Sequence, residues 1–170
     1  MIAHLLLLTT LWANPPKPRI VQHRFPAREH RDTSVNFIVF HYDSGSTPRS
    51  TFRYLRKKRA SYNYYIARDG TIYKLVDPAY KANHAGVSLY NGYLGMNKYS
   101  IGICFQNKYP QAYTMDQYTS AAWLVSVLYR RFPSARHHPL LGHSDIAFPR
   151  GRKSDPGDHF SWPTLQSLIP

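Results

Sequence analysis

From residue 35 onward, runs of apolar residues are separated by basic and turn-forming stretches, and these runs predict strands and helices in alternation. The continuous apolar run 35–41 fits a strand buried on both faces, and 100–106 fits a second such strand. Two stretches rich in β-forming residues, 62–67 and 71–76, flank Arg68-Asp69-Gly70. An Asp-Gly pair in that position predicts a hairpin.

The clearest helix is predicted between Thr114 and Phe132. Thr114 and Gln117 form a capping box at its start, and Pro133 follows its end. Apolar and small residues keep helical spacing along one face: Tyr118, Ala121, Ala122, Val125, Leu128, Tyr129 and Phe132.

Shorter elements complete the pattern. We expect a basic surface helix at 51–59, a short strand at 137–142 that leads into His143, and a last helix from about Ser161. The stretch 78–99 is long and rich in Gly, Asn and Tyr, which is typical of a functional loop. Because strands and helices alternate, the predicted fold class is α/β: a single domain with a central mixed β-sheet flanked by helices.

The N-terminal residues indicate export. Four consecutive leucines are followed by Ala13-Asn14-Pro15-Pro16, a pattern typical of a signal peptide that is cleaved after Ala13. We therefore predict a signal peptide at 1–13, a basic Pro-rich arm at 14–35, a folded domain at 36–170, and a secreted or periplasmic location. No stretch reaches about 18 apolar residues, so we expect no membrane insertion after cleavage.

Composition narrows the class of protein. The 170 residues are 43% hydrophobic, enough for one domain with its own core. The formal net charge of +13 predicts attraction to a polyanion such as an acidic cell-wall polymer. Nucleic acid is a rival partner suggested by charge alone, but the chain lacks a Gly/aromatic recognition signature, and the predicted export would not suit such a partner. The single cysteine, Cys104, excludes an internal disulfide, and we expect it to be a small buried hydrophobe.

A candidate zinc site emerges from two distant segments. His41 ends the first apolar strand, while His143, Lys153 and Asp155 lie close together near the C-terminus. A catalytic zinc takes three protein ligands and leaves a position for water, and His41, His143 and Asp155 offer two imidazoles and a carboxylate. Such an ion polarises a carbonyl and activates water, which suits amide hydrolysis, and Lys153 would stabilise the resulting oxyanion.

Other residues compete for these roles. Nine histidines allow other combinations, and His159 and Asp158 are rivals of Asp155 as ligands. Asp145 is better interpreted as a turn residue, or as a residue that supports a ligand, than as a ligand itself. Three tyrosines of the long loop either pack in the core or present their rings to sugars: Tyr90, Tyr93 and Tyr99.

The order of motifs resembles that of the type 2 N-acetylmuramoyl-L-alanine amidase family, which shares its fold with phage lysozyme-type amidases and peptidoglycan recognition proteins. Singly each motif is weak, but their shared order makes a specific match across about residues 36–168. The matching segments are Phe37–His41, Tyr62–Tyr73, Asn83–Gly86, Asn97–Ile103, Gly142–Ala147 and Arg152–Gly157.

The resemblance implies a zinc enzyme that cuts the amide between N-acetylmuramic acid and L-alanine of peptidoglycan. It implies that His41, His143 and Asp155 bind Zn²⁺. It also implies that Lys153 stabilises the transition state and that Tyr62 assists the water or the oxyanion. A further residue, His84, matches a histidine that lines the substrate cleft. The expected partner is peptidoglycan or its muropeptides, bound by a monomer.

Three positions depart from the family pattern. Cys104 stands where some amidases have a catalytic glutamate, Asn63 replaces a frequent histidine, and the segment between His143 and Lys153 is two residues longer. The alternative function is a non-catalytic peptidoglycan-binding module of the same fold, but binding-only relatives typically lose a metal ligand.

Overall fold

The computed structural model describes residues 15–26 and 29–170. The predicted signal peptide, 1–13, lies outside these ranges. Within them, no helix is both long and apolar enough to cross a membrane.

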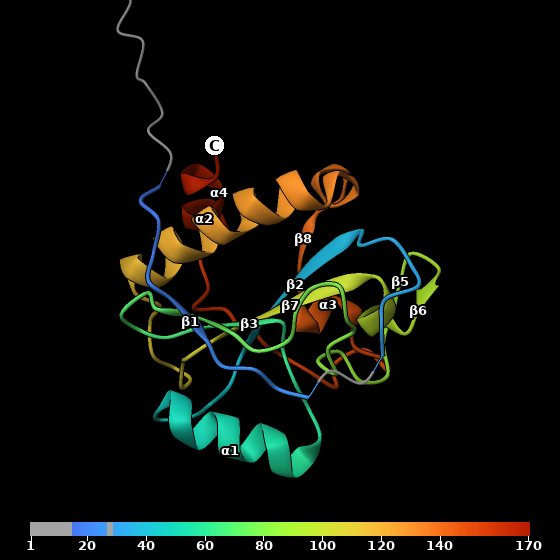
Figure 1. Ribbon diagram of the computed structural model, residues 1–170, viewed down its shortest axis with the longest axis horizontal. Helices are drawn as coiled ribbons and strands as arrows, with labels where there is room; N and C mark the ends of the chain where they lie inside the picture. The colour runs from blue at the N-terminus through green and yellow to red at the C-terminus, as the bar shows by residue number, and fades with distance from the viewer. Residues whose placement is uncertain (1–14, 27–28) are drawn as a thin grey trace, which may run out of the picture.

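A six-stranded mixed sheet forms the centre of the molecule (Figure 1). The strand order is β1-β4-β3-β7-β2-β8, in which β4 is antiparallel to β3 and the remaining neighbours are parallel. The strands are β1 (Ile20–Gln22), β2 (Phe37–Tyr42), β3 (Tyr64–Ile66), β4 (Ile72–Lys74), β7 (Ser100–Phe105) and β8 (Leu140–Gly142). The predicted α/β class with a central mixed sheet is confirmed.

The two continuous apolar runs form the central strands. Phe37 to His41 and all six residues of β7 are buried, because helices or loops cover both faces of the sheet at this point. The register pairs His41 with Cys104, and Cys104 with Tyr65 on the next strand. The hairpin predicted around Asp69-Gly70 is confirmed as the antiparallel pair β3–β4.

Helices flank the sheet on both sides (Figure 1). They are α1 (Pro48–Lys58), α2 (Met115–Arg131), α3 (His143–Ile146) and α4 (Trp162–Leu168), with 3₁₀ turns at Met96–Lys98 and Pro133–His137. The predicted capping box of α2 is present, since Thr114 accepts a hydrogen bond from Gln117 N and Gln117 Oε1 accepts one from Thr114 N. Ser161 caps α4.

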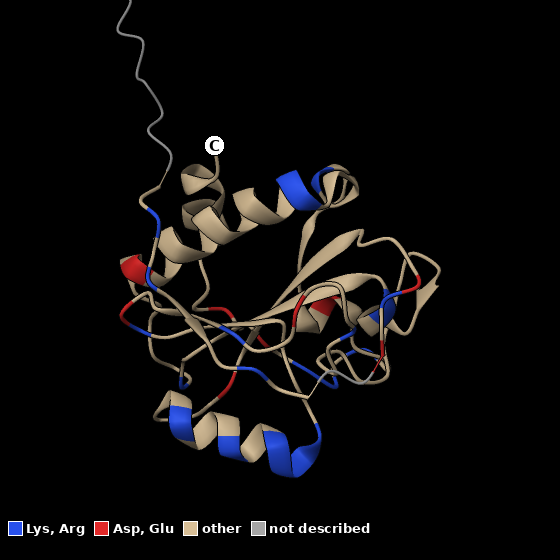
Figure 2. Cartoon of the chain, viewed as in Figure 1, with Lys and Arg blue, Asp and Glu red and all other residues tan. Residues whose placement is uncertain are grey.

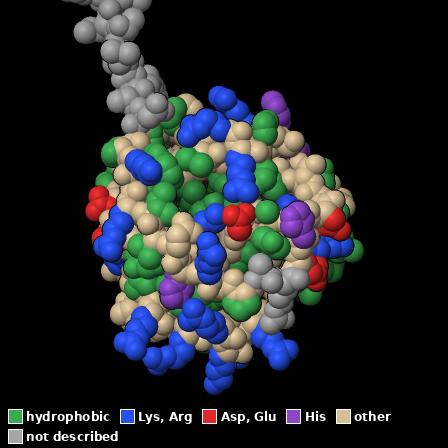
Figure 3. All heavy atoms as spheres, in the orientation of Figure 1, with side chains coloured by type: hydrophobic (Ala, Val, Ile, Leu, Met, Phe, Trp, Pro, Cys, Tyr) green, Lys and Arg blue, Asp and Glu red, His purple; other side chains and the backbone are tan. Residues whose placement is uncertain are grey.

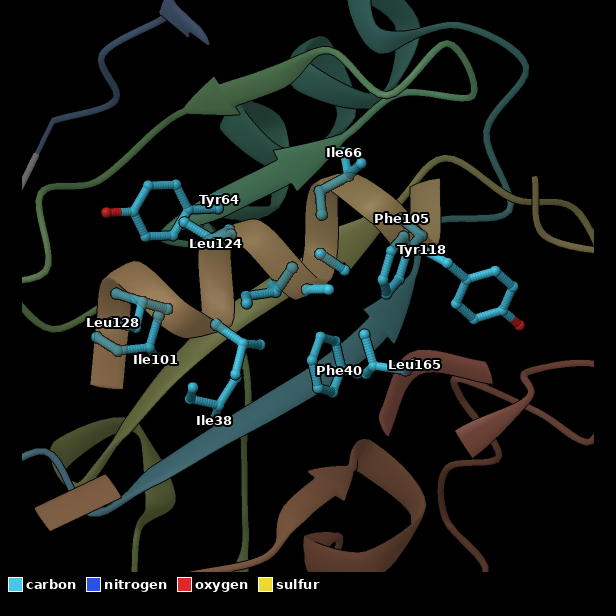
Figure 4. Packing of buried hydrophobic residues seen from close by; sticks show 14 of the residues in the cluster. Ile38, Phe40, Tyr64, Ile66, Ile101, Phe105, Tyr118, Leu124, Leu128 and Leu165 are labelled. Carbon is cyan, nitrogen blue, oxygen red and sulfur yellow. The ribbon is translucent and has the colours of Figure 1, made fainter. Parts of the chain in front are cut away.

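The largest hydrophobic cluster lies between the sheet and α2 (Figure 4). Ile38 and Phe40 of β2, together with Ile101 of β7, point toward Leu124 and Leu128 of α2. On the opposite face, Phe52 and Leu55 of α1 pack against Tyr65, Cys104 and Leu75. A third cluster, which includes Phe37, Val39 and Met96, is buried farther along the sheet.

The N-terminal segment is more closely joined to the domain than an arm on its surface. Ile20–Gln22 pair in parallel with Ile72–Lys74 as an edge strand, and Phe25 is buried beside Phe52. The pattern of the sequence did not predict this strand, because three residues between prolines and arginines carry too little periodicity.

The long segment 78–99 is more ordered than a loop. It contains a two-stranded hairpin, β5 (Leu89–Tyr90) with β6 (Tyr93–Leu94). Tyr90 and Tyr93 lie edge-on to the ring of Phe37, and Tyr99 contacts Tyr93, so these tyrosines pack against the core. The choice that the sequence left open is resolved in favour of packing.

Candidate metal centre and cleft

Three elements bring His41, His143 and Asp155 together. His41 is the fifth residue of the central strand β2, His143 is the first residue of α3 directly after β8, and Asp155 lies in the following loop. One nitrogen of each imidazole and one oxygen of the carboxylate lie within 4.8 Å of one another. Because β2 and β8 are adjacent parallel strands, their carboxyl ends place the two histidines side by side.

Local features of the chain hold the late segment against the strand. Ser144 N donates to Asp155 O at 3.0 Å, and Asp145 Oδ2 accepts from Gly142 N at 2.7 Å. A Cβ on Gly142 would lie 2.6 Å from Pro156 Cδ, so only glycine allows this close approach. Asp145 thus acts in the turn before His143, one of the two roles that the sequence left open.

The Asp155 carboxylate faces both imidazoles. Its Oδ2 lies 2.9 Å from His41 Nδ1 and 3.0 Å from His143 Nδ1. Burial alone would raise the pKa of Asp155, but its contacts with His143 and His41 hold that pKa below the ordinary value. The carboxyl group is therefore ionised at neutral pH.

The donor set fits a cation. His143 Nε2 lies 3.0 Å from the Ala85 carbonyl oxygen, which only accepts hydrogen bonds, so this nitrogen donates to it and Nδ1 faces the metal group. The Nδ1 atom of His143 lies 3.0 Å from Asp155 Oδ2. Two imidazoles with one carboxylate are a ligand set typical of Zn²⁺.

His41 is also suited to bind a metal. Its burial lowers its pKa to about 4, against the opposing effect of Asp155. The ring is fully buried and neutral at physiological pH, which is the form that binds a metal ion.

His84 lies directly behind His41. His84 Nδ1 is 3.0 Å from His41 Nε2, and His84 Nε2 is 3.2 Å from Ser100 Oγ. Burial and the neighbouring His41 and His143 lower the pKa of His84 well below its usual range. Only 7% of this residue is exposed, and its role as a substrate-binding residue stays a prediction.

Tyr62 and Cys104 are also neighbours of His41. The rings of Tyr62 and His41 have centroids 5.0 Å apart, and Cys104 pairs in register with His41 on the neighbouring strand β7. Burial and nearby Asp43 and Asp155 raise the pKa of Cys104 far above its usual range. The thiol therefore stays protonated at neutral pH and is not a general base where some relatives carry a glutamate. Cys104 is fully buried, as predicted.

Lys153 and Tyr62 line an open cleft of about 720 Å³ beside α1. The same cleft reaches Asp155 and is walled by Tyr54 and Ser50 of α1. Lys153 is exposed at its rim, two residues before Asp155. The cleft thus brings a cation, a phenol and the candidate metal centre to one side of the molecule.

The competing residues lie elsewhere. His159 and Asp158 are exposed, and the ring of His159 packs against Tyr109 rather than toward Asp155. Among the residues that the structure describes, His41, His143 and Asp155 form the one group with the spacing of a metal site.

The longer segment before Lys153 leaves the candidate ligands together. Phe148 N donates to Val87 O at 3.1 Å, and Arg152 Nη2 donates to the same oxygen at 2.7 Å. Arg152 Nη2 also lies 3.2 Å from Ala85 O, the acceptor of His143. The additional residues therefore lie at the surface, while Arg152 joins the loop to the segment that follows His84.

Sequence reasoning missed several residues that support the site. Asn97 Oδ1 accepts from the backbone nitrogens of both His84 and Ala85, at 3.0 and 2.8 Å. Asn63, at the position of a frequent histidine, accepts from Gly102 N with its side-chain oxygen. Asp43 accepts from the Tyr65 hydroxyl at 2.7 Å in the cleft wall. In the sequence, these residues could have been singled out only because Asn63 and Asn97 lie in the matching segments and Asp43 lies close to His41.

Comparison with known proteins extends these observations. A family model described as N-acetylmuramoyl-L-alanine amidase matches residues 31–158. The 1,6-anhydro-N-acetylmuramyl-L-alanine amidase AmpD of Citrobacter freundii is 39% identical over 111 residues, which cover 65% of this chain and 58% of that relative. The chain therefore spans somewhat over half the length of this curated relative.

Solved structures share the fold. A crystal structure of a selenomethionine derivative of AmpD superposes with a TM-score of 0.73 and 29% identity, covering 88% of this chain and 94% of that one. AmpDh3 from Pseudomonas aeruginosa, in complex with anhydromuramic pentapeptide, superposes with a TM-score of 0.71 and 29% identity. That match covers 79% of this chain and 59% of the other.

Proposed function

Because the chain belongs to the N-acetylmuramoyl-L-alanine amidase family, we propose that it hydrolyses the amide between N-acetylmuramic acid and L-alanine in peptidoglycan or its fragments. The observation that carries the proposal is the convergence of His41, His143 and Asp155 at the edge of an open cleft. AmpDh3 is described in complex with anhydromuramic pentapeptide, which supports a muropeptide as the substrate class.

Zinc is the proposed cofactor, with His41, His143 and Asp155 as its ligands. When bound, it would supply a Lewis acid that polarises the scissile carbonyl and makes water nucleophilic near neutral pH. The protein contributes two imidazoles, of which His41 is held neutral by burial, and one ionised carboxylate. The intact ligand set argues against the non-catalytic alternative.

Lys153 and Tyr62 are the proposed catalytic side chains. The Lys153 ammonium at the cleft rim would stabilise negative charge on the carbonyl oxygen as the tetrahedral intermediate forms. Burial and the nearby Cys104 and Asp155 raise the pKa of Tyr62 well above its usual range, so its hydroxyl stays protonated and acts as a hydrogen-bond donor. The C–N bond then breaks, and the peptide amine leaves with the proton that the attacking water gives up.

Substitution of single ligands tests the proposal. Purified His41→Ala and Asp155→Ala should each lose bound zinc and the release of peptide from sacculi, while circular dichroism stays that of the unsubstituted chain. The His159→Ala variant is the matched control, because His159 is exposed and away from the group. Undiminished hydrolysis by zinc-free protein would refute the proposal.

Export is a separate proposal that rests on the apolar residues before Ala13. We expect the protein recovered from the periplasm or medium to begin at Asn14, as N-terminal sequencing would establish. A full-length chain that remains inside the cell would contradict it. We also propose that the protein acts on peptidoglycan as a monomer, whether or not it is exported.

A further inference from the structure

His84 is enclosed by a chain of polar contacts that leads to His41. Its Nδ1 lies 3.0 Å from His41 Nε2, and its Nε2 lies 3.2 Å from Ser100 Oγ. Asn97 fixes the backbone nitrogen of His84 at 3.0 Å. A Cβ on Gly102 would lie 2.5 Å from His84 Cγ, so the glycine of β7 provides the space for this ring.

The direction of these hydrogen bonds follows from Ser100. Its hydroxyl donates to the Met96 carbonyl oxygen at 2.6 Å, and a hydroxyl has only one hydrogen to donate. Ser100 Oγ therefore accepts from His84 Nε2. A neutral His84 then has no hydrogen on Nδ1, so Nδ1 accepts from His41 Nε2.

This assignment determines the tautomer of His41. With its one proton on Nε2, the neutral His41 ring presents the lone pair of Nδ1. That atom lies 2.9 Å from Asp155 Oδ2, on the side of the three converging donor atoms. The relay Met96–Ser100–His84–His41 thus specifies which nitrogen of His41 faces the proposed ion.

We infer that His84 is a positioning residue, which orients His41 for metal binding through the hydrogen-bond relay from Ser100. The inference rests on the proposed zinc site and adds a function for a side chain that the family resemblance places in the substrate cleft. Because His84 is only 7% exposed, it is better placed to contact His41 than to contact a substrate. Groups that hold a metal-binding histidine commonly change metal affinity about 10–100-fold when removed.

Zinc affinity of the full chain, measured by competition with a chromophoric chelator, tests the relay. The His84→Ala variant removes the acceptor of His41, and we expect zinc to bind about 10–100-fold more weakly. The His84→Asn variant keeps a side-chain oxygen near the place of Nδ1, so it should recover most of the affinity. The Ser100→Ala variant should weaken binding in the same direction, because His84 Nε2 then loses its acceptor.

Two controls separate positioning from other roles. The His138→Asn variant changes a histidine that packs on Phe37 outside the relay, and it should bind zinc as the unsubstituted chain does. Melting temperatures of the metal-free variants report any loss of fold. A His84→Ala protein that is less stable or has a higher KM, but binds zinc with unchanged affinity, would overturn the inference while leaving the proposed function intact. Failure of the unsubstituted chain to bind zinc would overturn both.

Discussion

Lys153 and Asp155 lie two positions apart on one loop, and their side chains have opposite environments. Asp155 is 9% exposed and faces two imidazoles, whereas Lys153 is exposed at the rim of the cleft. The buried Asp155 carboxylate suits a permanently bound metal ion. The exposed Lys153 ammonium suits the negative charge that develops on the substrate carbonyl oxygen during the reaction. The two residues should therefore respond differently to substitution.

Replacing Lys153 by alanine tests this difference. We expect kcat to fall about 10²–10³-fold, the effect of losing one group that stabilises an oxyanion, while zinc affinity changes less than twofold. Steady-state kinetics on a soluble muropeptide and a chelator titration measure the two quantities. Lys153→Arg, which keeps the charge, should retain more activity than Lys153→Ala. Equal losses of zinc binding and turnover would instead mark Lys153 as structural.

Single residues also show where sequence reasoning stopped. The identities of His41, His143 and Asp155 as one group followed from residue chemistry and the motif order, and the structure brings them together. The contact between His84 and His41 did not follow, because 43 positions separate them and only the folded sheet determines which ring faces which. Pattern analysis finds polar residues at strand ends but does not give their hydrogen-bond partners.

At the scale of elements, the strong patterns and the Asp-Gly hairpin were predicted correctly, whereas β1 and the pair β5–β6 were not. β2, β7 and α2 follow from continuous apolar runs and a capping box. The edge strand β1 is held by its pairing with β4, so its own three residues carry little signal. Farther along the same N-terminal segment, the Arg31 guanidinium is within hydrogen-bond distance of five carbonyl oxygens: Pro78, Tyr80, Asn97, Lys98 and Ser100.

Arg31 should therefore be a point of high sensitivity in the N-terminal segment. An Arg31→Lys substitution keeps the charge but replaces five donors by three in a different geometry, so several carbonyl groups lose their partner. We expect the free energy of unfolding to fall by about 2–3 kcal/mol, measured by urea denaturation. Arg24→Lys, at an exposed position, should change it by less than about 0.5 kcal/mol. Equal values for the two variants would contradict this role of Arg31.

For the whole molecule, positive charge is concentrated beside the cleft. Helix α1 has no acidic residue in its first turn and three basic residues in its last, and Figure 2 shows basic positions along its length. Figure 3 shows basic side chains gathered over the same region. Because α1 also walls the cleft through Ser50 and Tyr54, a polyanionic wall drawn to its outer side would lie next to the proposed site.

Charge reversal on α1 tests this arrangement. Arg53 and Lys57 are exposed and four positions apart, hence on one side of the helix. The double variant Arg53→Glu/Lys57→Glu should bind sacculi about tenfold more weakly at low ionic strength, a difference that disappears in high salt. Turnover of a small soluble muropeptide should be unchanged. The double variant Arg130→Glu/Arg136→Glu, on the exposed end of α2 and the turn after it, is the control. Equal weakening by both pairs would mean that net charge alone controls binding.

The identity of the bond that is cut tests the central claim most directly. Sacculi digested by the unsubstituted chain, by chelator-treated protein and by chelator-treated protein resupplied with zinc can be compared by mass spectrometry. The proposed function predicts free stem peptides that begin with L-alanine and glycan strands that keep their lactyl groups, formed with zinc and absent without it. Cleavage of a glycosidic or a peptide cross-link bond, or the same products after removal of zinc, would contradict it.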